Sequence, residues 1–392
     1  MVLKSPWTVT LARSRSVNNG GGMQVNWRRI RAAKNSFAAL YAACEQSGRL
    51  MQAVNSPERD ITCYSLNSVT ARRYRDEMEN AGCIVIAGGP HPSACPEEVA
   101  DYADYVVTGE GEYALPLLLD HIESGSAGPI PPGVYTKDSS VPANGCVLLD
   151  AYPPFTKEKG YIEITRGCPH RCGYCQTPRL FGRWMRHRSI ESIREAAAVY
   201  EDVRFVTPNA LAYGSDGITP DLRKVELLLK SLPGRIFFGT FPSEVRPEFI
   251  SDEALELITR YCANDRLHFG AQSGSDIVLE GLVRGHTVAD ALDALELCRD
   301  HDLTPVVDFI LGLPLETEDN MHATMELIRE VVKNGKAHVH YFMPLPGTPL
   351  AGSDPVPVPR EIQRDLGRLA LAGKITGSWT GAELRFFRNR SD

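Results

Sequence analysis

The sequence predicts an α/β protein of two units, a doubly wound parallel sheet followed by a curved, partly closed six-stranded (β/α) barrel. Strand-like and helix-like patterns alternate along most of the 392 residues. Apolar strands end in glycine-bearing loops before helices, which is typical of parallel sheets. A stretch rich in proline and glycine, residues 126–160, separates the two patterns and reads as a linker. We therefore expect domains at residues 1–125 and 161–352, with a C-terminal extension at 353–392.

The first unit is expected to begin with a strand and to alternate from there. Its predicted strands are 7–12, 61–66, 83–89 and 105–112, and its predicted helices are 36–48, 69–82, 96–101 and 113–125. Three of these helices end at glycine, a common helix stop because glycine adopts the left-handed conformation without strain.

The second unit repeats strand and then helix six times. The predicted strands lie near 161–166, 203–207, 235–240, 266–271, 304–310 and 337–343, and the helices near 189–201, 219–231, 252–263, 287–301, 317–333 and 359–373. In barrels of this kind the chemistry lies at the carboxyl ends of the strands. The residues that follow each strand are therefore the first candidates for a site.

Composition excludes several classes of protein. Hydrophobic residues make up 43% and charged residues 23%, as in ordinary globular proteins. We find no apolar run near the roughly 20 residues of a membrane helix and no signal peptide, so we expect a cytoplasmic location and no membrane partner. The net charge of −7 does not favour nucleic acid.

Three of the ten cysteines, Cys168, Cys172 and Cys175, lie within eight residues. The other seven are scattered singly, as small buried residues are. Close thiolates bind zinc or an iron–sulfur cluster, or they act in redox chemistry. Zinc with His170 as a fourth ligand, a redox pair and chance clustering remain alternatives. The favoured interpretation is a [4Fe-4S] cluster with three cysteine ligands and one open iron.

The CxxxCxxC spacing, with Tyr174 before the last cysteine and a position after the first barrel strand, resembles the radical S-adenosylmethionine (SAM) superfamily. The resemblance implies that the open iron chelates SAM and that the reduced cluster cleaves it to a 5′-deoxyadenosyl radical. It also implies a reducing partner of the flavodoxin or ferredoxin type.

Further strand ends resemble the group that includes coproporphyrinogen-type enzymes, methylthiotransferases and cobalamin-dependent radical enzymes. The resemblance implies SAM contacts by Tyr174, Asn209, Ser243, Glu244, Gln272, Arg284, Asp308 and Gly312. A guanidinium suits the methionine carboxylate, and a glycine lets the backbone approach adenine. The usual Gly-Gly-Glu after the second strand is missing, and Asn209 stands in its place.

Each of these contacts also has an ordinary explanation. Glu244 and Arg246 could be surface charges, and Arg284 could pair with Glu280 one helical turn away. Asp308 could belong to a buried polar network.

Residues 83–119 resemble the Rossmann-like cobalamin-binding domain that precedes many radical SAM barrels. The resemblance implies that cobalamin is surrounded by Ser65, Gly88, Gly89, His91, Gly109 and Glu110. The family's Asp-x-His-x-x-Gly motif is absent from residues 10–27, where we expect it. Either cobalt has no protein ligand or the domain has kept its fold and lost the cofactor.

We therefore expect a radical SAM enzyme that most resembles small archaeal-type cobalamin-binding radical proteins. The favoured reaction is cobalamin-dependent methyl transfer to an unknown substrate. The alternatives are a methylthiotransferase-like RNA-modifying enzyme, although no second cysteine cluster exists, and a non-catalytic cobalamin or iron–sulfur carrier. Residues 179–188 are basic and aromatic, but RNA is not the expected partner. Residues 381–392 could add a final strand.

Overall fold

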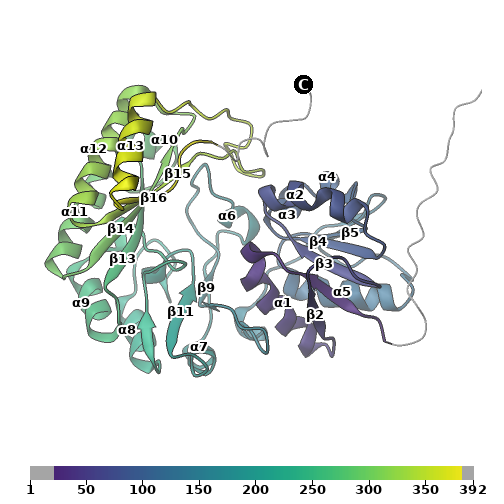
Figure 1. Cartoon of the computed structure of the whole chain (residues 1–392). Coiled ribbons are helices and arrows are strands. Elements are labelled where there is room, and N and C mark those ends of the chain that lie inside the picture. The colour runs from purple at the N-terminus through teal and green to yellow at the C-terminus, as the bar shows by residue number, and fades with distance from the viewer. Residues whose placement is uncertain (1–21, 382–392) are drawn as a thin grey trace, which may run out of the picture.

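The computed structural model describes residues 22–381 as two α/β units that lie beside each other (Figure 1). The first unit contains β1 (Val25–Arg28), α1 (Lys34–Gln46), β2 (Met51–Val54), β3 (Ile61–Ser65), α2 (Ser68–Glu79), β4 (Ile84–Gly88), α3 (Pro90–Ala94), α4 (Pro96–Ala100), β5 (Tyr105–Val107), α5 (Gly111–Glu123), β6 (Val134–Tyr135) and β7 (Ser140–Val141). Its sheet has the order β2-β1-β3-β4-β5-β6-β7, in which β1 to β5 are parallel. Helices cover both faces, with α1 and α5 on one side and α2 to α4 on the other (Figure 1).

The start of this unit corrects one expectation. The predicted strand at 7–12 lies outside the described residues. The strand β1 lies at Val25–Arg28 and overlaps the end of the segment 10–27 in which we expected the histidine motif, and β2 was not expected. The loop after β1 is therefore 29–33, which contains no histidine either. The predicted strands 61–66 and 83–89 correspond to β3 and β4, which are buried apolar runs, whereas β1 and β2 have only four residues each and give a weak pattern.

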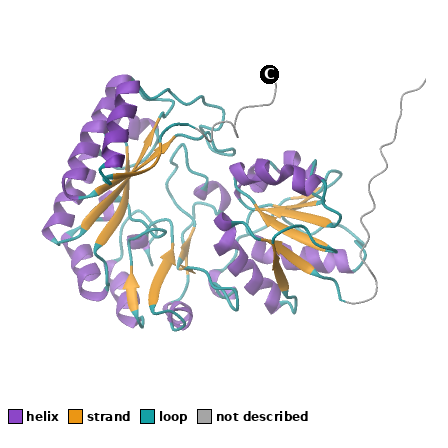
Figure 2. Ribbon diagram, viewed as in Figure 1, coloured by secondary structure: helices purple, strands orange, loops and turns teal. Residues whose placement is uncertain are grey.

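The second unit contains β8 (Ile162–Glu163), β9 (Thr165–Arg166), α6 (Thr177–Leu180), β10 (Arg186–His187), α7 (Ile190–Ala197), β11 (Asp202–Val206), α8 (Leu222–Ser231), β12 (Arg235–Phe237), α9 (Asp252–Tyr261), β13 (Arg266–Gln272), α10 (Asp276–Gly281), α11 (Val288–Asp300), β14 (Thr304–Leu311), α12 (Glu318–Asn334), β15 (Lys336–Tyr341), α13 (Arg360–Leu371) and β16 (Ile375–Ser378). Its parallel strands form two sheets, β12-β11-β8 and β13-β14-β15-β16. A parallel bridge between Val245 and Phe269 connects them. Figure 2 shows the helices on the outside of this curved wall.

The predicted two-unit α/β fold is confirmed, and each of the six predicted barrel strands is present. A further strand, β16, pairs with β15 and extends the sheet into the predicted C-terminal extension. The proposed strand at 381–392 lies almost wholly outside the described residues. The domain boundaries themselves stay a prediction.

Alternation along β14 shows how the barrel wall is built. Val307, Phe309 and Leu311 are fully buried in the core beneath the helices. The intervening Asp308 and Ile310 are less buried and face the inside of the barrel, because successive side chains of a strand point to opposite faces. The outer face of the wall is therefore apolar, and polar side chains on its inner face are available to bind a ligand.

Capping sets where the outer helices begin. Thr317 accepts a hydrogen bond from the backbone of Asn320, and the Asn320 side chain accepts one from the backbone of Thr317. Thr287 and Asp290 form the same reciprocal pair at the start of α11. Such capping boxes fix the helix starts directly after the strand-end loops.

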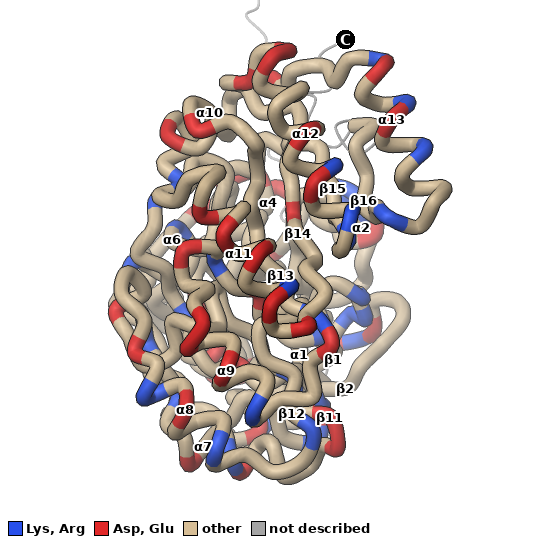
Figure 3. The backbone as a smooth tube through the Cα atoms, turned by 90° about the vertical axis from the view of Figure 1, so that its left-hand side faces the viewer, with Lys and Arg blue, Asp and Glu red and all other residues tan. Residues whose placement is uncertain are grey.

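The outer surface carries both acidic and basic residues (Figure 3). Within residues 22–381, no helix has the length and apolar character needed to cross a membrane.

Candidate active site

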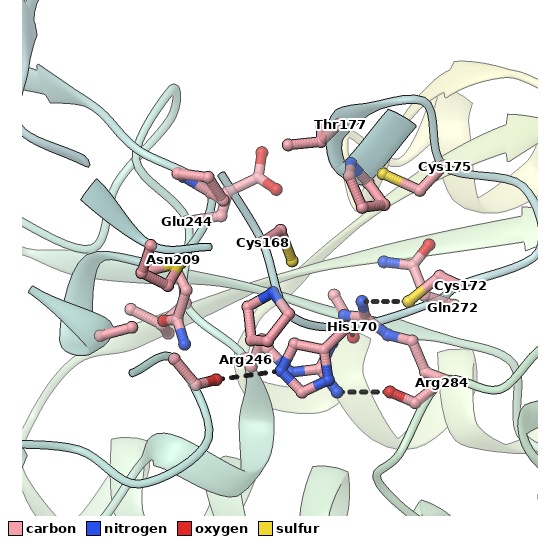
Figure 4. A pocket seen from close by; sticks show the side chains of 18 of the residues that line it. Cys168, His170, Cys172, Cys175, Thr177, Asn209, Glu244, Arg246, Gln272 and Arg284 are labelled. Atoms are coloured by element: carbon pink, nitrogen blue, oxygen red, sulfur yellow. Dashed lines mark hydrogen bonds between the residues drawn. The ribbon is translucent and has the colours of Figure 1, made fainter. Parts of the chain in front are cut away.

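The three clustered cysteines face one cavity of about 210 Å³ at the carboxyl ends of the barrel strands. Figure 4 shows the sulfur atoms of Cys168, Cys172 and Cys175 pointing into the same space. Gly167 has φ +91°, and a Cβ there would come within 2.1 Å of the Trp184 carbonyl oxygen, so only glycine allows this loop path. Burial raises the pKa of Cys168. A positively charged metal centre would favour its thiolate, which fits three sulfur ligands.

The wall opposite the cysteines contains an unsatisfied amide. Asn209 is 4% exposed, and neither its Oδ1 nor its Nδ2 has a hydrogen-bond partner within residues 22–381. An amide buried without a partner costs about 1–3 kcal/mol, so such a group in a cavity wall points to a ligand. Gln272 lines the same cavity and has φ +70°, a conformation that non-glycine residues rarely adopt. Both residues fit a polar ligand beside the cluster.

Arg284 lies beside the cysteine loop (Figure 4). Its Nη2 donates to the Gly270 carbonyl oxygen at 3.0 Å, its Nη1 lies 3.7 Å from the Cys172 sulfur, and its Nε has no partner. Among the described residues it forms no ion pair with Glu280, so the helical-pair explanation is wrong. A guanidinium with free hydrogen-bonding capacity at this place suits a carboxylate ligand.

Arg246 is a residue whose role the sequence did not reveal. It is 5% exposed, so its interpretation as a surface charge is wrong. Its Nε donates to Glu248 and its Nη2 to the carbonyl oxygen of Arg284. Arg246 therefore supports the loop that carries Arg284, and it lines the cavity as well.

Glu244 and Asp308 form a pair of neighbouring carboxyl groups. Burial, together with the Glu244 charge, raises the pKa of Asp308 to about 8. Burial also raises the pKa of Glu244, so neither group is a surface charge. The pair holds a proton near neutral pH because two adjacent buried carboxylates repel each other. Glu244 lines the cavity, whereas Asp308 is not among the residues that line it.

Two other predicted SAM contacts lie outside the cavity lining. Ser243 is fully buried and its Oγ donates to the Thr240 carbonyl oxygen at 2.9 Å. Gly312 has φ +80°, and a Cβ there would come within 2.4 Å of the Tyr341 ring, so packing against Tyr341 explains this glycine. Tyr174, Asn209, Glu244, Gln272 and Arg284 do line the cavity. Their contact with SAM stays a prediction.

A second cavity of about 580 Å³ lies between the two units. Of the residues predicted for cobalamin, it is lined by Ser65, Gly88, Gly89, Gly109 and Glu110. These residues lie at the carboxyl ends of β3, β4 and β5, which is the edge where ligands usually bind in such sheets. Tyr174, Cys175 and Thr177 line both cavities, so the two spaces are neighbours.

His91 is not part of this lining. It is 3% exposed, its Nδ1 lies 3.2 Å from Ser68 Oγ, and its Nε2 lies 3.6 Å from Glu98. The side chain therefore packs inside the first unit, although the prediction that it contacts cobalamin is not tested directly.

Buried ion pairs join the two units below the second cavity. Glu110 accepts hydrogen bonds from Arg166 at 3.0 Å, from Arg186 at 2.9 and 2.6 Å, and from the Val147 backbone at 2.9 Å. Arg166 also pairs with Glu112 at 2.5 Å. Burial opposes ionisation of Glu112, but Arg166, a backbone hydrogen bond and Arg186 together outweigh it, and the pKa of Glu112 lies below its ordinary value. The carboxylate of Glu110 is thus occupied by protein donors.

Two family models match the chain, Radical SAM superfamily over residues 162–328 and B12 binding domain over residues 60–119. A tRNA-2-methylthio-N(6)-dimethylallyladenosine synthase from Alkalilimnicola ehrlichii is 30% identical over 347 residues, which are 82% of this chain and 74% of that protein. The chain belongs to the radical SAM superfamily. The expectation of an enzyme of this superfamily with a B12-binding domain ahead of the barrel is therefore confirmed.

Other relatives match less of their own length. The corresponding synthase from Sulfurihydrogenibium is 29% identical over 57% of this chain and 52% of that protein. A threonylcarbamoyladenosine tRNA methylthiotransferase from Thermotoga maritima is 29% identical over 49% of this chain and 45% of that protein. This radical SAM chain thus aligns with about half of the length of these two relatives.

Among solved structures, the radical SAM methyltransferase TsrM from Kitasatospora setae, with cobalamin and a [4Fe-4S] cluster bound, has a TM-score of 0.63 at 16% identity. The match covers 84% of this chain and 74% of TsrM. The cobalamin-dependent radical SAM enzyme OxsB has a TM-score of 0.60 at 16% identity, over 90% of this chain and 55% of OxsB. At these identities the likeness concerns the fold. With the two family models, it supports [4Fe-4S], SAM and cobalamin as the cofactors.

Proposed function

We propose that this protein is a cobalamin-dependent radical SAM methyltransferase that methylates an unactivated carbon atom. The observation that carries the proposal is the common wall of the two cavities, formed by Tyr174, Cys175 and Thr177. A group bound in the cysteine cavity and a corrin bound between the units would face one substrate position. The cluster and SAM, when bound, supply the radical, and cobalamin supplies the methyl group.

The residues of the chain have distinct parts in this proposal. Cys168, Cys172 and Cys175 hold the cluster. Arg284 pairs with the carboxylate of SAM, and Asn209 and Gln272 take its remaining polar groups, which would satisfy the free amide of Asn209. The glycines at 88, 89 and 109 let a flat macrocycle approach the backbone. Burial at the interface excludes water from the reacting atoms.

A second candidate is a methylthiotransferase-like enzyme that modifies RNA. The relatives named as tRNA-2-methylthio-N(6)-dimethylallyladenosine synthases and as a tRNA methylthiotransferase favour it. Exposed Arg179, Arg183 and Trp184 beside the cluster loop could contact RNA. The sequence opposes it, because the seven cysteines outside the triplet do not form a second cluster motif.

The two candidates are separated with anaerobically reconstituted protein. We expect one cobalamin per chain, and formation of both 5′-deoxyadenosine and S-adenosylhomocysteine with SAM, reductant and an accepted substrate. Ala39→Trp, which fills the second cavity, should abolish cobalamin binding and leave the iron content unchanged. Wild-type protein that binds no cobalamin but adds methylthio groups to tRNA, measured by mass spectrometry, would establish the second candidate instead.

A further inference from the structure

The inner face of the barrel carries two histidines opposite an aspartate. Asp308 on β14 is paired in register with His338 on β15, and His340 follows two residues later on the same face. Paired residues of adjacent strands have side chains close together on one face of the sheet. The alternate residues Ala337 and Val339 are fully buried beneath the outer helices. The sheet geometry thus directs an aspartate and two imidazoles to one face of the sheet, where Asp308 and His338 are half-buried and His340 is exposed.

These three side chains converge without bonding to one another. One ligand atom from each lies within 4.8 Å of the other two. The imidazole rings of His338 and His340 lie edge to face, with their centroids 4.4 Å apart. In the described part of the chain, no hydrogen bond or ion pair joins Asp308 to either histidine. A simple hydrogen-bonded network would bring such groups within about 3.2 Å.

A neighbouring hydroxyl orients one imidazole. The Nδ1 of His338 lies 2.7 Å from Thr376 Oγ1 on β16, the strand beyond β15. When Nδ1 carries the proton and donates it to Thr376, the lone pair of His338 is on Nε2. Metal-binding histidines are typically held in this way by a hydrogen bond to their second nitrogen. On β13, His268 adds a further imidazole whose buried Nε2 has no hydrogen-bond partner in the described part of the chain.

We propose that Asp308, His338 and His340 bind a divalent first-row transition ion of the Zn²⁺ class inside the barrel. Two imidazoles and one carboxylate are a common ligand set for such ions, and three protein ligands leave positions for a substrate oxygen or nitrogen. The site reassigns Asp308 from a direct SAM contact to an ion ligand. Glu244 lies beside Asp308, connects the site to the cysteine cavity and adds negative charge. The Glu244 charge raises the pKa of Asp308, and the positive charge of Arg284 lowers it. The proposal does not depend on methyl transfer.

Two other groups of metal-binding residues in the described chain are weaker. Glu318, His322 and Glu361 lie on the surface, and the Nε2 of His322 is already paired with Glu361 at 3.0 Å. His91, Cys95 and Glu98 lie near Arg72 and Arg75, whose charges oppose a cation. The first group supplies a matched control, His322→Ala.

The experiment uses cluster-loaded protein without an affinity tag, dialysed anaerobically against micromolar ZnCl₂. Elemental analysis then counts iron for the cluster and zinc for the new site in the same sample. We expect one zinc per wild-type chain, and affinity about 100-fold weaker in His338→Ala and His340→Ala, because each removes one of three ligands. Thr376→Val, which keeps all three ligands, should weaken zinc binding about 10- to 100-fold. His322→Ala should bind zinc like the wild type.

Iron content and unfolding midpoint, compared with the wild type, show that each variant is folded. A wild-type chain that takes up no zinc would overturn the proposal. So would equal zinc in His338→Ala, His340→Ala and Thr376→Val, because the zinc would then be bound elsewhere, for example at the cysteines.

Discussion

Replacing Glu110 by Gln should destabilise the protein strongly, because this change removes the charge at the centre of the ion pairs between the units. The Glu110 side chain is 9% exposed, and those of Arg166 and Arg186 are each 7% exposed. Among the described residues, Glu110 is the one carboxylate paired with Arg186, so the variant would leave that buried guanidinium without a carboxylate, whereas Arg166 keeps Glu112 and Glu163. Breaking a buried pair in this way costs about 3–5 kcal/mol. Glutamine keeps the shape and one acceptor, so we expect the free energy of unfolding to fall by about 3 kcal/mol, at the lower end of this range.

The measurement is urea unfolding followed by both intrinsic fluorescence and circular dichroism, since a two-domain chain need not unfold in one step. Asp365→Asn is the control, because Asp365 pairs with Arg329 at 2.9 Å on the exposed surface. Such exposed pairs contribute about 0–1 kcal/mol. If Glu110→Gln lost no more free energy of unfolding than Asp365→Asn, the reasoning about a buried interface would be refuted.

The remaining predictions concern the site and its supports. Burial raises the pKa of Glu316 to about 7, so its contribution to stability is present below about pH 4.5 and is lost as the pH rises through 7. The stability of Glu316→Gln relative to wild type should therefore rise by up to about 3 kcal/mol between pH 4.5 and 8; a difference independent of pH in denaturant titrations would count against this. Arg284→Gln should weaken SAM binding about 10- to 100-fold at unchanged iron content, measured by equilibrium dialysis, and unaltered affinity would remove Arg284 from the SAM site. Cys172→Ala should lose the cluster, whereas Cys298→Ala, a buried cysteine far along the chain, should keep four iron atoms per chain; equal iron in both would contradict the ligand assignment.

The repeating pattern of the chain predicted most of the barrel, because helical segments follow the strands and most of these helices have one apolar, buried face. It failed at the first sheet's edge, where β1 and β2 are four residues each and carry no distinctive pattern. The strand β16 was missed for a related reason, because three of its four residues are exposed and one is glycine.

The sequence predicted those parts of the site whose residues are close together in the chain. The cysteine triplet is contiguous, and its convergence on one cavity follows from a single loop. Arg246 looked like a surface residue because only the fold brings it against the backbone of Arg284, 38 residues later. Glu110 looked like a ligand contact because its two arginine partners lie in the other unit. Sequence spacing holds no information about such distant pairs.

The central claim is that three cysteine sulfurs hold a [4Fe-4S] cluster whose fourth iron is open to SAM. Electron paramagnetic resonance of the reduced, anaerobically reconstituted protein, recorded with and without SAM, tests it most directly. We predict four iron atoms per chain and a cluster signal that changes when SAM is added. A signal that is identical with and without SAM, or zinc in place of iron at the cysteines, would contradict the claim.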